Sequence, residues 1–218
     1  MSRKFNLVVF DWDGTLMDST VAITRSIQAA CRDLSLPVPG DDVASHVIGL
    51  GLGDALRMAV PSLPEADYGR MSERYRHHYL SKDHELELFS GIRPMLDQLR
   101  GQGYFLAVAT GKSRVGLNRA MSQAGITHLF DATRCADETF SKPNPAMLLE
   151  LTRFLGQDMQ KTLMIGDTTH DLQMAANAGA KAVGVAYGAH PLPILLEHAP
   201  MYVAKTVPEL HGWLQENL

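Results

Sequence analysis

Residues 7–15 read Leu-Val-Val-Phe-Asp-Trp-Asp-Gly-Thr, an apolar run that ends abruptly in acidic and small residues. An apolar run without polar alternation is typical of a strand that is buried on both faces, as in a parallel sheet covered by helices. Three later runs have the same character, at residues 105–109, 163–165 and 182–186. The sequence therefore predicts a buried parallel sheet whose first strand ends at Asp11.

Helical patterns lie between these runs. They cover residues 114–124, 145–155 and 171–178, and a glycine follows each of them, as is common at helix C-termini. Ser113 stands where an N-cap residue is expected. This alternation of strand and helix predicts an α/β fold, a doubly wound parallel sheet with a Rossmann-like core.

One long segment departs from the alternation. Between Ser19 and Phe89 no strand pattern occurs, and apolar residues recur at helical spacing, as in the series Ile23, Ile27 and Leu34. Further helical pieces are expected at residues 54–60 and 65–81. We therefore expect residues 1–15 and 91–218 to form the α/β core, and residues 16–90 to form a small α-helical cap inserted into it.

The composition is that of an ordinary globular protein. The 218 residues are 45% hydrophobic and 20% charged, which excludes a disordered chain. Basic residues number 20 and acidic residues 24, so a nucleic-acid partner is not expected. The chain shows neither a targeting signal nor an apolar stretch long enough to span a bilayer, and we expect a cytoplasmic protein without a membrane partner. A monomer is the expected state.

Polar residues follow the predicted strands at the edge where open parallel sheets bind ligands. Asp11 and Asp13 follow the first strand, Thr110-Gly111-Lys112 the second, and Asp167 the third, with Asp171 close behind. Lys142 stands just before a helix. We expect the four carboxylates, the threonine hydroxyl and the two ammonium groups to converge at this edge.

Such a group of carboxylates requires a cation, because like charges held together repel one another. Mg²⁺ prefers oxygen ligands and commonly takes one or two carboxylates together with a substrate phosphate. Lys112, Lys142 and the backbone N–H groups near Thr110 and Gly111 are suited to bind anionic oxygens. Together these residues predict a phosphoryl-transfer site.

The same residues carry a family resemblance. Asp11-Trp12-Asp13-Gly14-Thr15-Leu16 resembles the first motif of the haloacid dehalogenase-like hydrolase superfamily. Thr110, Lys142 and the segment from Gly166 to Asp171 are similar to its second, third and fourth motifs. The helical insertion is similar to the cap of the phosphoglycolate phosphatase-like branch. The resemblance covers almost the whole chain.

This resemblance implies a Mg²⁺-dependent phosphatase that hydrolyses a small phosphorylated metabolite, with phosphoglycolate as the default substrate. It implies that Asp11 attacks phosphorus to form an aspartyl-phosphate, and that Asp13 serves as general acid and then general base. Thr110 and Lys142 would bind the phosphoryl oxygens, with Gly111 and Lys112 as further candidates for phosphate binding. The implied metal ligands are Asp11, Asp13 through its backbone carbonyl, Asp167, and Asp171 either directly or through water.

Three alternative functions share part of this pattern. A phosphomutase would use the same aspartyl-phosphate on a sugar phosphate, and the motifs do not separate it from a phosphatase. A dehalogenase needs neither the metal nor the acid at Asp13. A receiver-type signalling module also gathers acids, a threonine and a lysine around a phosphorylatable aspartate. The length of this chain, its cap and Asp13 disfavour that alternative.

Some of these residues also have simpler interpretations. Asp171 is compatible with a helix N-terminal charge that the dipole favours, and Lys112 with a surface lysine. The glycines of Gly49-Leu50-Gly51-Leu52-Gly53 have the wrong spacing for a dinucleotide-binding loop. The segment is more compatible with a loop between cap helices that faces the active site.

Overall fold

A computed structural model describes residues 3–218, and its centre is a six-stranded parallel sheet. The strand order is β3-β2-β1-β4-β5-β6, and in the register Val8 of β1 pairs with Leu106 on one side and Leu163 on the other. The strands are β1 (Leu7–Phe10), β2 (Phe105–Thr110), β3 (Ala132–Cys135), β4 (Thr162–Gly166), β5 (Lys181–Val185) and β6 (Val203–Ala204). The predicted fold class is confirmed, and each of the four predicted apolar runs is a strand.

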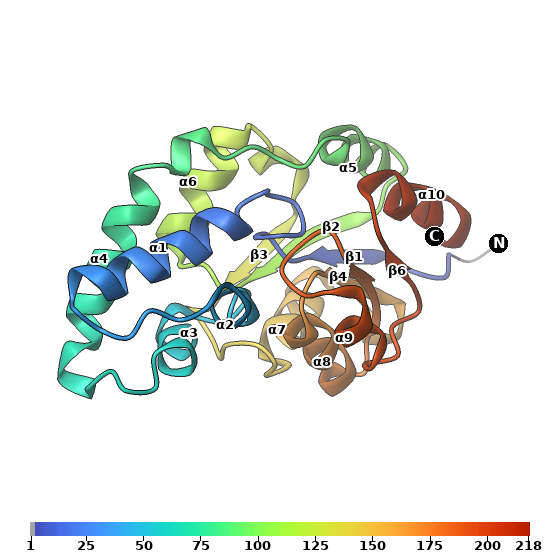
Figure 1. Ribbon diagram of the computed structural model, residues 1–218. Helices are drawn as coiled ribbons and strands as arrows, with labels where there is room; N and C mark the ends of the chain where they lie inside the picture. Colours follow the sequence, from blue (N-terminus) through green and yellow to red (C-terminus); the bar gives the residue numbers. More distant parts are fainter. Residues whose placement is uncertain (1–2) are drawn as a thin grey trace.

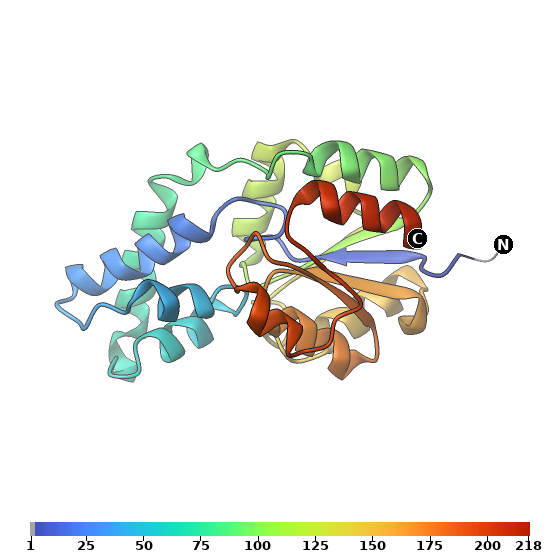
Figure 2. The same cartoon turned by 45° about the vertical axis from the view of Figure 1, so that its right-hand side comes forward.

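Helices cover both faces of the sheet, as Figure 2 shows. Successive residues of β1 point to opposite faces, so Val8 and Phe10 belong to one apolar cluster while Leu7 and Val9 belong to the other. The first cluster packs against α5 (Ile92–Gly101), α6 (Arg114–Ala124) and α10 (Val207–Asn217). The second packs against α7 (Ala146–Leu155) and α8 (Thr169–Ala178), and α9 (Leu192–Leu196) lies beside α8.

Between β1 and α5 the chain forms a helical insertion, α1–α4. These helices are α1 (Thr20–Asp33), α2 (Asp41–His46), α3 (Leu52–Ala59) and α4 (Tyr68–Leu80). They lie beyond the carboxyl ends of the strands, and the described chain begins and ends at the opposite end of the sheet (Figure 1). The insertion has its own apolar cluster, which includes Ile27, Leu56 and Met71. Because α3 begins at Leu52, Gly53 is helical and the connecting loop is shorter than its glycines suggested.

Short 3₁₀ turns complete the described chain, at Glu65–Asp67, Asp83–Glu85, Thr127–Leu129 and Met159–Lys161. Cys31 and Cys135 are buried free thiols. Over residues 3–218, no helix combines the length and the apolarity that crossing a bilayer demands.

Candidate active site

The carboxyl ends of three neighbouring strands bring the predicted residues to one place. Asp11 follows β1, Thr110 ends β2, and Asp167 follows β4. Their side chains are fully buried, as is Asp171 in the first turn of α8. Because β1 lies between β2 and β4, loops that are far apart in sequence meet around Asp11.

A buried ion-pair network joins Asp11, Lys142 and Asp171. The Nζ atom of Lys142 lies 2.7 Å from Oδ1 of Asp11 and 2.6 Å from Oδ1 of Asp171. Burial raises the pKa of Asp11 well above its usual value, the charges of Asp171 and Asp167 raise it further, and Lys142 opposes them. Burial alone would lower the pKa of Lys142, but the two carboxylates outweigh it and raise the pKa. The lysine is therefore held as a cation.

Asp167 adds a third carboxylate. Thr15 donates a hydrogen bond of 2.8 Å to its Oδ1, and the backbone N–H of Ala189 donates one of 2.7 Å to its Oδ2. Burial, and then the charge of Asp171, raises the pKa of Asp167 to about 7. One carboxylate oxygen from each of Asp11, Asp167 and Asp171 lies within 4.8 Å of the others.

These three side chains fit a hard divalent cation. Oδ2 of Asp11 is buried and has no hydrogen-bond or ion-pair partner among residues 3–218. One ammonium group faces three carboxylates, so the group carries an excess of buried negative charge. Mg²⁺ is bound by oxygen ligands of this kind. The cluster could therefore bind a metal ion.

The carboxylate of Asp13 turns away from this cluster. Ser19 donates a hydrogen bond of 2.6 Å to its Oδ1, and Nζ of Lys112 lies 2.9 and 3.0 Å from its two oxygens. Asp13 is therefore separated from the group formed by Asp11, Asp167 and Asp171. This placement is compatible with the expectation that Asp13 would reach a metal through its backbone carbonyl.

Lys112 also contacts the helical insertion. Its Nζ donates a hydrogen bond of 2.9 Å to the hydroxyl of Tyr79 in α4. Burial would lower the pKa of Lys112, but Asp13 and the neighbouring tyrosines raise it. The sequence offered Lys112 as a phosphate-binding residue, whereas its ammonium lies against Asp13. Tyr79 carried no sequence signal, because its role depends on a contact between distant elements.

A loop of the insertion covers the end of β2. A Cβ atom on Gly111 would lie 2.3 Å from the carbonyl oxygen of Leu50 and 2.6 Å from that of Gly49, so any side chain there would clash. Gly49 has φ +91°, a conformation that favours glycine. A Cβ atom on Gly49 would lie 3.9 Å from Oδ2 of Asp11. The loop thus faces the candidate site, as the sequence suggested.

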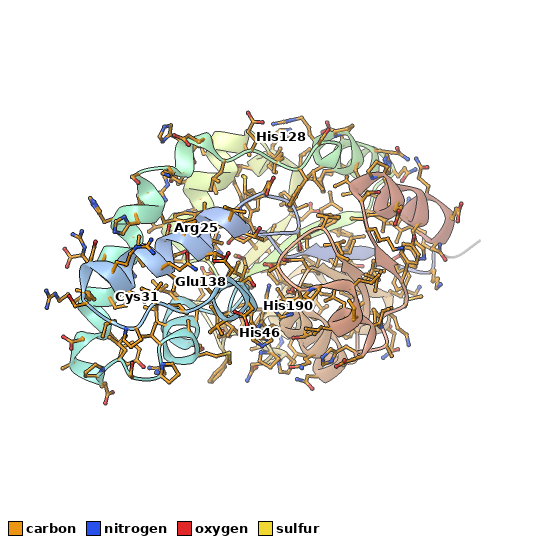
Figure 3. The ribbon with its side chains drawn as sticks, in the orientation of Figure 1. Arg25, Cys31, His46, His128, Glu138 and His190 are labelled. Atoms are coloured by element: carbon orange, nitrogen blue, oxygen red, sulfur yellow. The ribbon has the colours of Figure 1, made fainter. Side chains whose placement is uncertain are left out.

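Three histidines form a second link between insertion and core. Ring nitrogens of His170 and His190 donate to the backbone oxygen of His46, at 2.9 and 3.0 Å. The rings of His46 and His190 stack with centroids 4.6 Å apart, and both are labelled in Figure 3. Burial lowers the pKa of His190 to about 4, so its ring is neutral near pH 7. Sequence reasoning missed this cluster, because its members are widely separated along the chain.

Comparison with known proteins extends these observations. The sequence model described as haloacid dehalogenase-like hydrolase matches residues 8–185. The probable phosphatase IndB of Dickeya dadantii is 37% identical over 213 residues, which cover 94% of this chain and 92% of the relative. A phosphoglycolate phosphatase of Agrobacterium fabrum is 32% identical over 196 residues, covering 87% and 84% of the two chains.

A solved structure shows the same architecture over nearly the whole chain. It is the crystal structure of a predicted phosphatase from Clostridium acetobutylicum, which is 26% identical and has a TM-score of 0.87. The similarity covers 99% of this chain and 100% of that chain. The helical insertion is therefore included in the shared fold.

Proposed function

The chain belongs to the haloacid dehalogenase-like hydrolase family, and from the chemistry of its site we propose that it is a Mg²⁺-dependent phosphatase that hydrolyses a small phosphomonoester through an aspartyl-phosphate. One observation carries the proposal: the buried Asp11 carboxylate, with one oxygen against Lys142 and the other without a partner among residues 3–218. That second oxygen is suited to act as a nucleophile. The phosphatase names of the relatives support the same reaction.

We propose that Asp11, Asp167 and the backbone carbonyl of Asp13 hold the metal ion, with Asp171 as a ligand or as an anchor of the site. When bound, the ion offsets the carboxylate charges and stabilises negative charge on the phosphoryl oxygens. Asp171 accepts hydrogen bonds from the backbone N–H and the hydroxyl of Thr168, at 3.1 and 2.7 Å, so its own position is well defined.

In the proposed reaction Asp11 attacks phosphorus and the bond to the leaving oxygen breaks. Asp13 supplies the proton that the departing alkoxide needs and is left as a carboxylate. The resulting Asp13 carboxylate then accepts a proton from water as the water attacks the aspartyl-phosphate, which releases phosphate and restores Asp11. Thr110 and Lys142 bind phosphoryl oxygens during both steps.

We propose that residues 16–90 act as a cap over a core made of residues 1–15 and 91–218. Two sets of contacts support this role: Lys112 with Tyr79, and His46 with His170 and His190. Lys112 would orient the Asp13 carboxylate while tying it to α4. Closure of such a lid excludes bulk water from the reaction.

Mg²⁺ is expected to stabilise the folded protein more at pH 8 than at pH 5. In the folded state burial raises the pKa of Asp167 to about 7, whereas the ordinary pKa of an aspartate is 3.8. Between these values the folded state binds more protons than the unfolded state, so metal-free stability falls as pH rises. A metal ion relieves the repulsion that causes this fall and competes with the proton at low pH. Thermal unfolding with Mg²⁺ and with EDTA measures the difference.

The matched variant for this experiment is Asp167→Asn, with the exposed Asp42→Asn as control. Asp167→Asn should lose most of the Mg²⁺-dependent shift, and Asp42→Asn should retain it. Phosphate release from p-nitrophenyl phosphate should require Mg²⁺ and stop after exhaustive chelation. Activity that survives chelation would contradict the metal requirement.

Asp13→Asn is expected to slow the hydrolysis of alkyl phosphates far more than that of p-nitrophenyl phosphate. An alkoxide needs a proton as it leaves, whereas p-nitrophenolate leaves readily without one. General acid catalysis contributes roughly 10²–10⁴-fold, so kcat/KM for an alkyl phosphate should fall by about that factor. Asp18→Asn, an exposed carboxylate nearby, is the control. Equal losses on both substrates would contradict the acid role of Asp13.

A further inference from the structure

A cavity of about 820 Å³ opens beside the candidate site, between the helical insertion and the core. Its lining includes Asp13, Gly111 and Lys112, so it begins where the leaving group of a bound phosphomonoester would lie. Cavities of roughly 300–1,000 Å³ are typical of drug-sized ligands. A glycolate leaving group would fill only a small part of this space.

The walls of the cavity are mainly apolar on both sides. Ile23 and Ile27 of α1 and Tyr79 of α4 form part of the wall contributed by the insertion. On the core side, Val115 and Phe140 line the same space although 76% and 70% of their surfaces are exposed. Exposed apolar side chains that converge on one cavity indicate a ligand-binding surface, because a bound ligand removes their apolar area from water.

The charges along the cavity are balanced and mostly engaged. Among the described lining residues, Lys112 is paired with Asp13, and Arg119 lies 2.7 Å from Asp83. The remaining lining cation, Arg76, has an exposed side chain. The lining acids are Asp13, Asp54 and Asp137, which equal the three cations in number. Within the described part of the chain, the lining thus provides no buried, uncommitted cation for a second anionic group.

A neutral donor is present instead. Tyr75 lines the cavity, and its side chain is partly buried. Burial raises the pKa of Tyr75, so the hydroxyl stays protonated and uncharged at neutral pH. It is suited to bind a neutral oxygen of a leaving group. A carboxylate or a second phosphate in this cavity would lose its hydration without gaining a counter-ion.

We infer that the substrate is the phosphomonoester of a neutral, mainly apolar alcohol at least as large as a six-membered ring, and not a phosphate that carries a second anionic group. This inference rests on the proposed phosphatase function and concerns the leaving group alone. The apolar walls would bind the ring, the Tyr75 hydroxyl would bind a polar substituent, and Asp13 would protonate the ester oxygen.

The test compares kcat/KM for 2-phenylethyl phosphate, ethyl phosphate, 2-phosphoglycolate and pyrophosphate. The three phosphate esters release alkyl alcohols, so differences among them report mainly on binding in the cavity. The kcat/KM for 2-phenylethyl phosphate should be at least about ten times that for ethyl phosphate or 2-phosphoglycolate. Burial of a ring in an apolar site stabilises the bound transition state by that factor or more. Pyrophosphate should be the poorest substrate of the panel.

A charge variant tests the cause of the selection. Val115→Lys places a cation at the wall of the cavity, and Val21→Lys makes the same change on a residue that is 68% exposed and lies outside the lining. Val115→Lys should raise the ratio of kcat/KM for 2-phosphoglycolate over 2-phenylethyl phosphate about tenfold, and Val21→Lys should leave the ratio unchanged. Both sites are exposed, so folding should be preserved.

The outcomes separate this inference from the proposed function. A higher kcat/KM for 2-phosphoglycolate or pyrophosphate than for 2-phenylethyl phosphate would overturn the inference and leave the phosphatase intact. An unchanged ratio in Val115→Lys would overturn the charge argument. If no member of the panel released phosphate, the proposed function would be overturned, and this inference with it.

Discussion

Replacing Asp11 with asparagine is expected to reduce the turnover of p-nitrophenyl phosphate roughly 10⁴-fold or more. The amide of asparagine is a poor nucleophile, and without the attack on phosphorus no aspartyl-phosphate can form. The side chain is fully buried beside Lys142, at 2.7 Å, so water has little room to replace its carboxylate. Steady-state kinetics with Mg²⁺ measures the loss of turnover. Intact-mass analysis after rapid quenching measures the loss of the aspartyl-phosphate.

The same variant should fold at least as stably as the wild type. Burial raises the pKa of Asp11, which shows that the charged form is unfavourable in the folded state. Asparagine removes this charge, so metal-free Asp11→Asn should unfold at an equal or higher urea concentration at pH 8. Loss of activity with retained stability would identify a chemical role. Near-normal turnover would show that Asp11 is not the nucleophile.

Replacing Lys142 with methionine is expected to lower the free energy of unfolding by about 3–5 kcal/mol at pH 8 in EDTA. The ammonium group contacts two buried carboxylates, Asp11 and Asp171, and its removal leaves both without a counter-ion. The loss should be smaller at pH 5, because burial raises the pKa of Asp11 and protonation of that carboxylate relieves part of the uncompensated charge. Mg²⁺ should restore part of the stability for the same reason. Urea unfolding under these conditions tests each expectation.

Lys181→Met is the matched control, because Lys181 is an exposed lysine at the start of β5. A surface substitution of this kind should change the free energy of unfolding by no more than about 0.5 kcal/mol. Lys142→Met should also lose turnover, since the lysine is proposed to bind phosphoryl oxygens. Equal unfolding midpoints for the two variants would contradict the proposed electrostatic role of Lys142.

The interior strands were predictable because they are apolar on both faces. Leu7–Phe10 and Thr162–Gly166 are buried throughout, and such runs are recognisable without knowledge of the fold. β3 and β6 were missed for physical reasons. β3 pairs on one side only, and its residues Ala132, Thr133 and Arg134 are partly exposed, so it lacks the apolar pattern. β6 contains two residues, too few for a pattern.

The candidate site was predictable to the extent that it depends on strand ends. Asp11, Thr110 and Asp167 each come directly at or after the end of a buried strand, and parallel strands bring those ends to one edge of the sheet. The sequence did not reveal the division of the carboxylates into two groups. Asp13 pairs with Lys112 while Asp11 pairs with Lys142, and this division depends on side-chain directions.

Local pattern alone was therefore enough to establish the α/β fold, the helical insertion and the set of residues at the sheet edge, because burial and strand order follow from short-range periodicity and chain connectivity. The three-dimensional packing of distant elements was needed for the rest: the contact of Lys112 with Tyr79, the histidine cluster, and the apolar, charge-balanced cavity. Those features arise where the insertion meets the core. They depend on directions and distances between side chains that no local pattern in the sequence encodes.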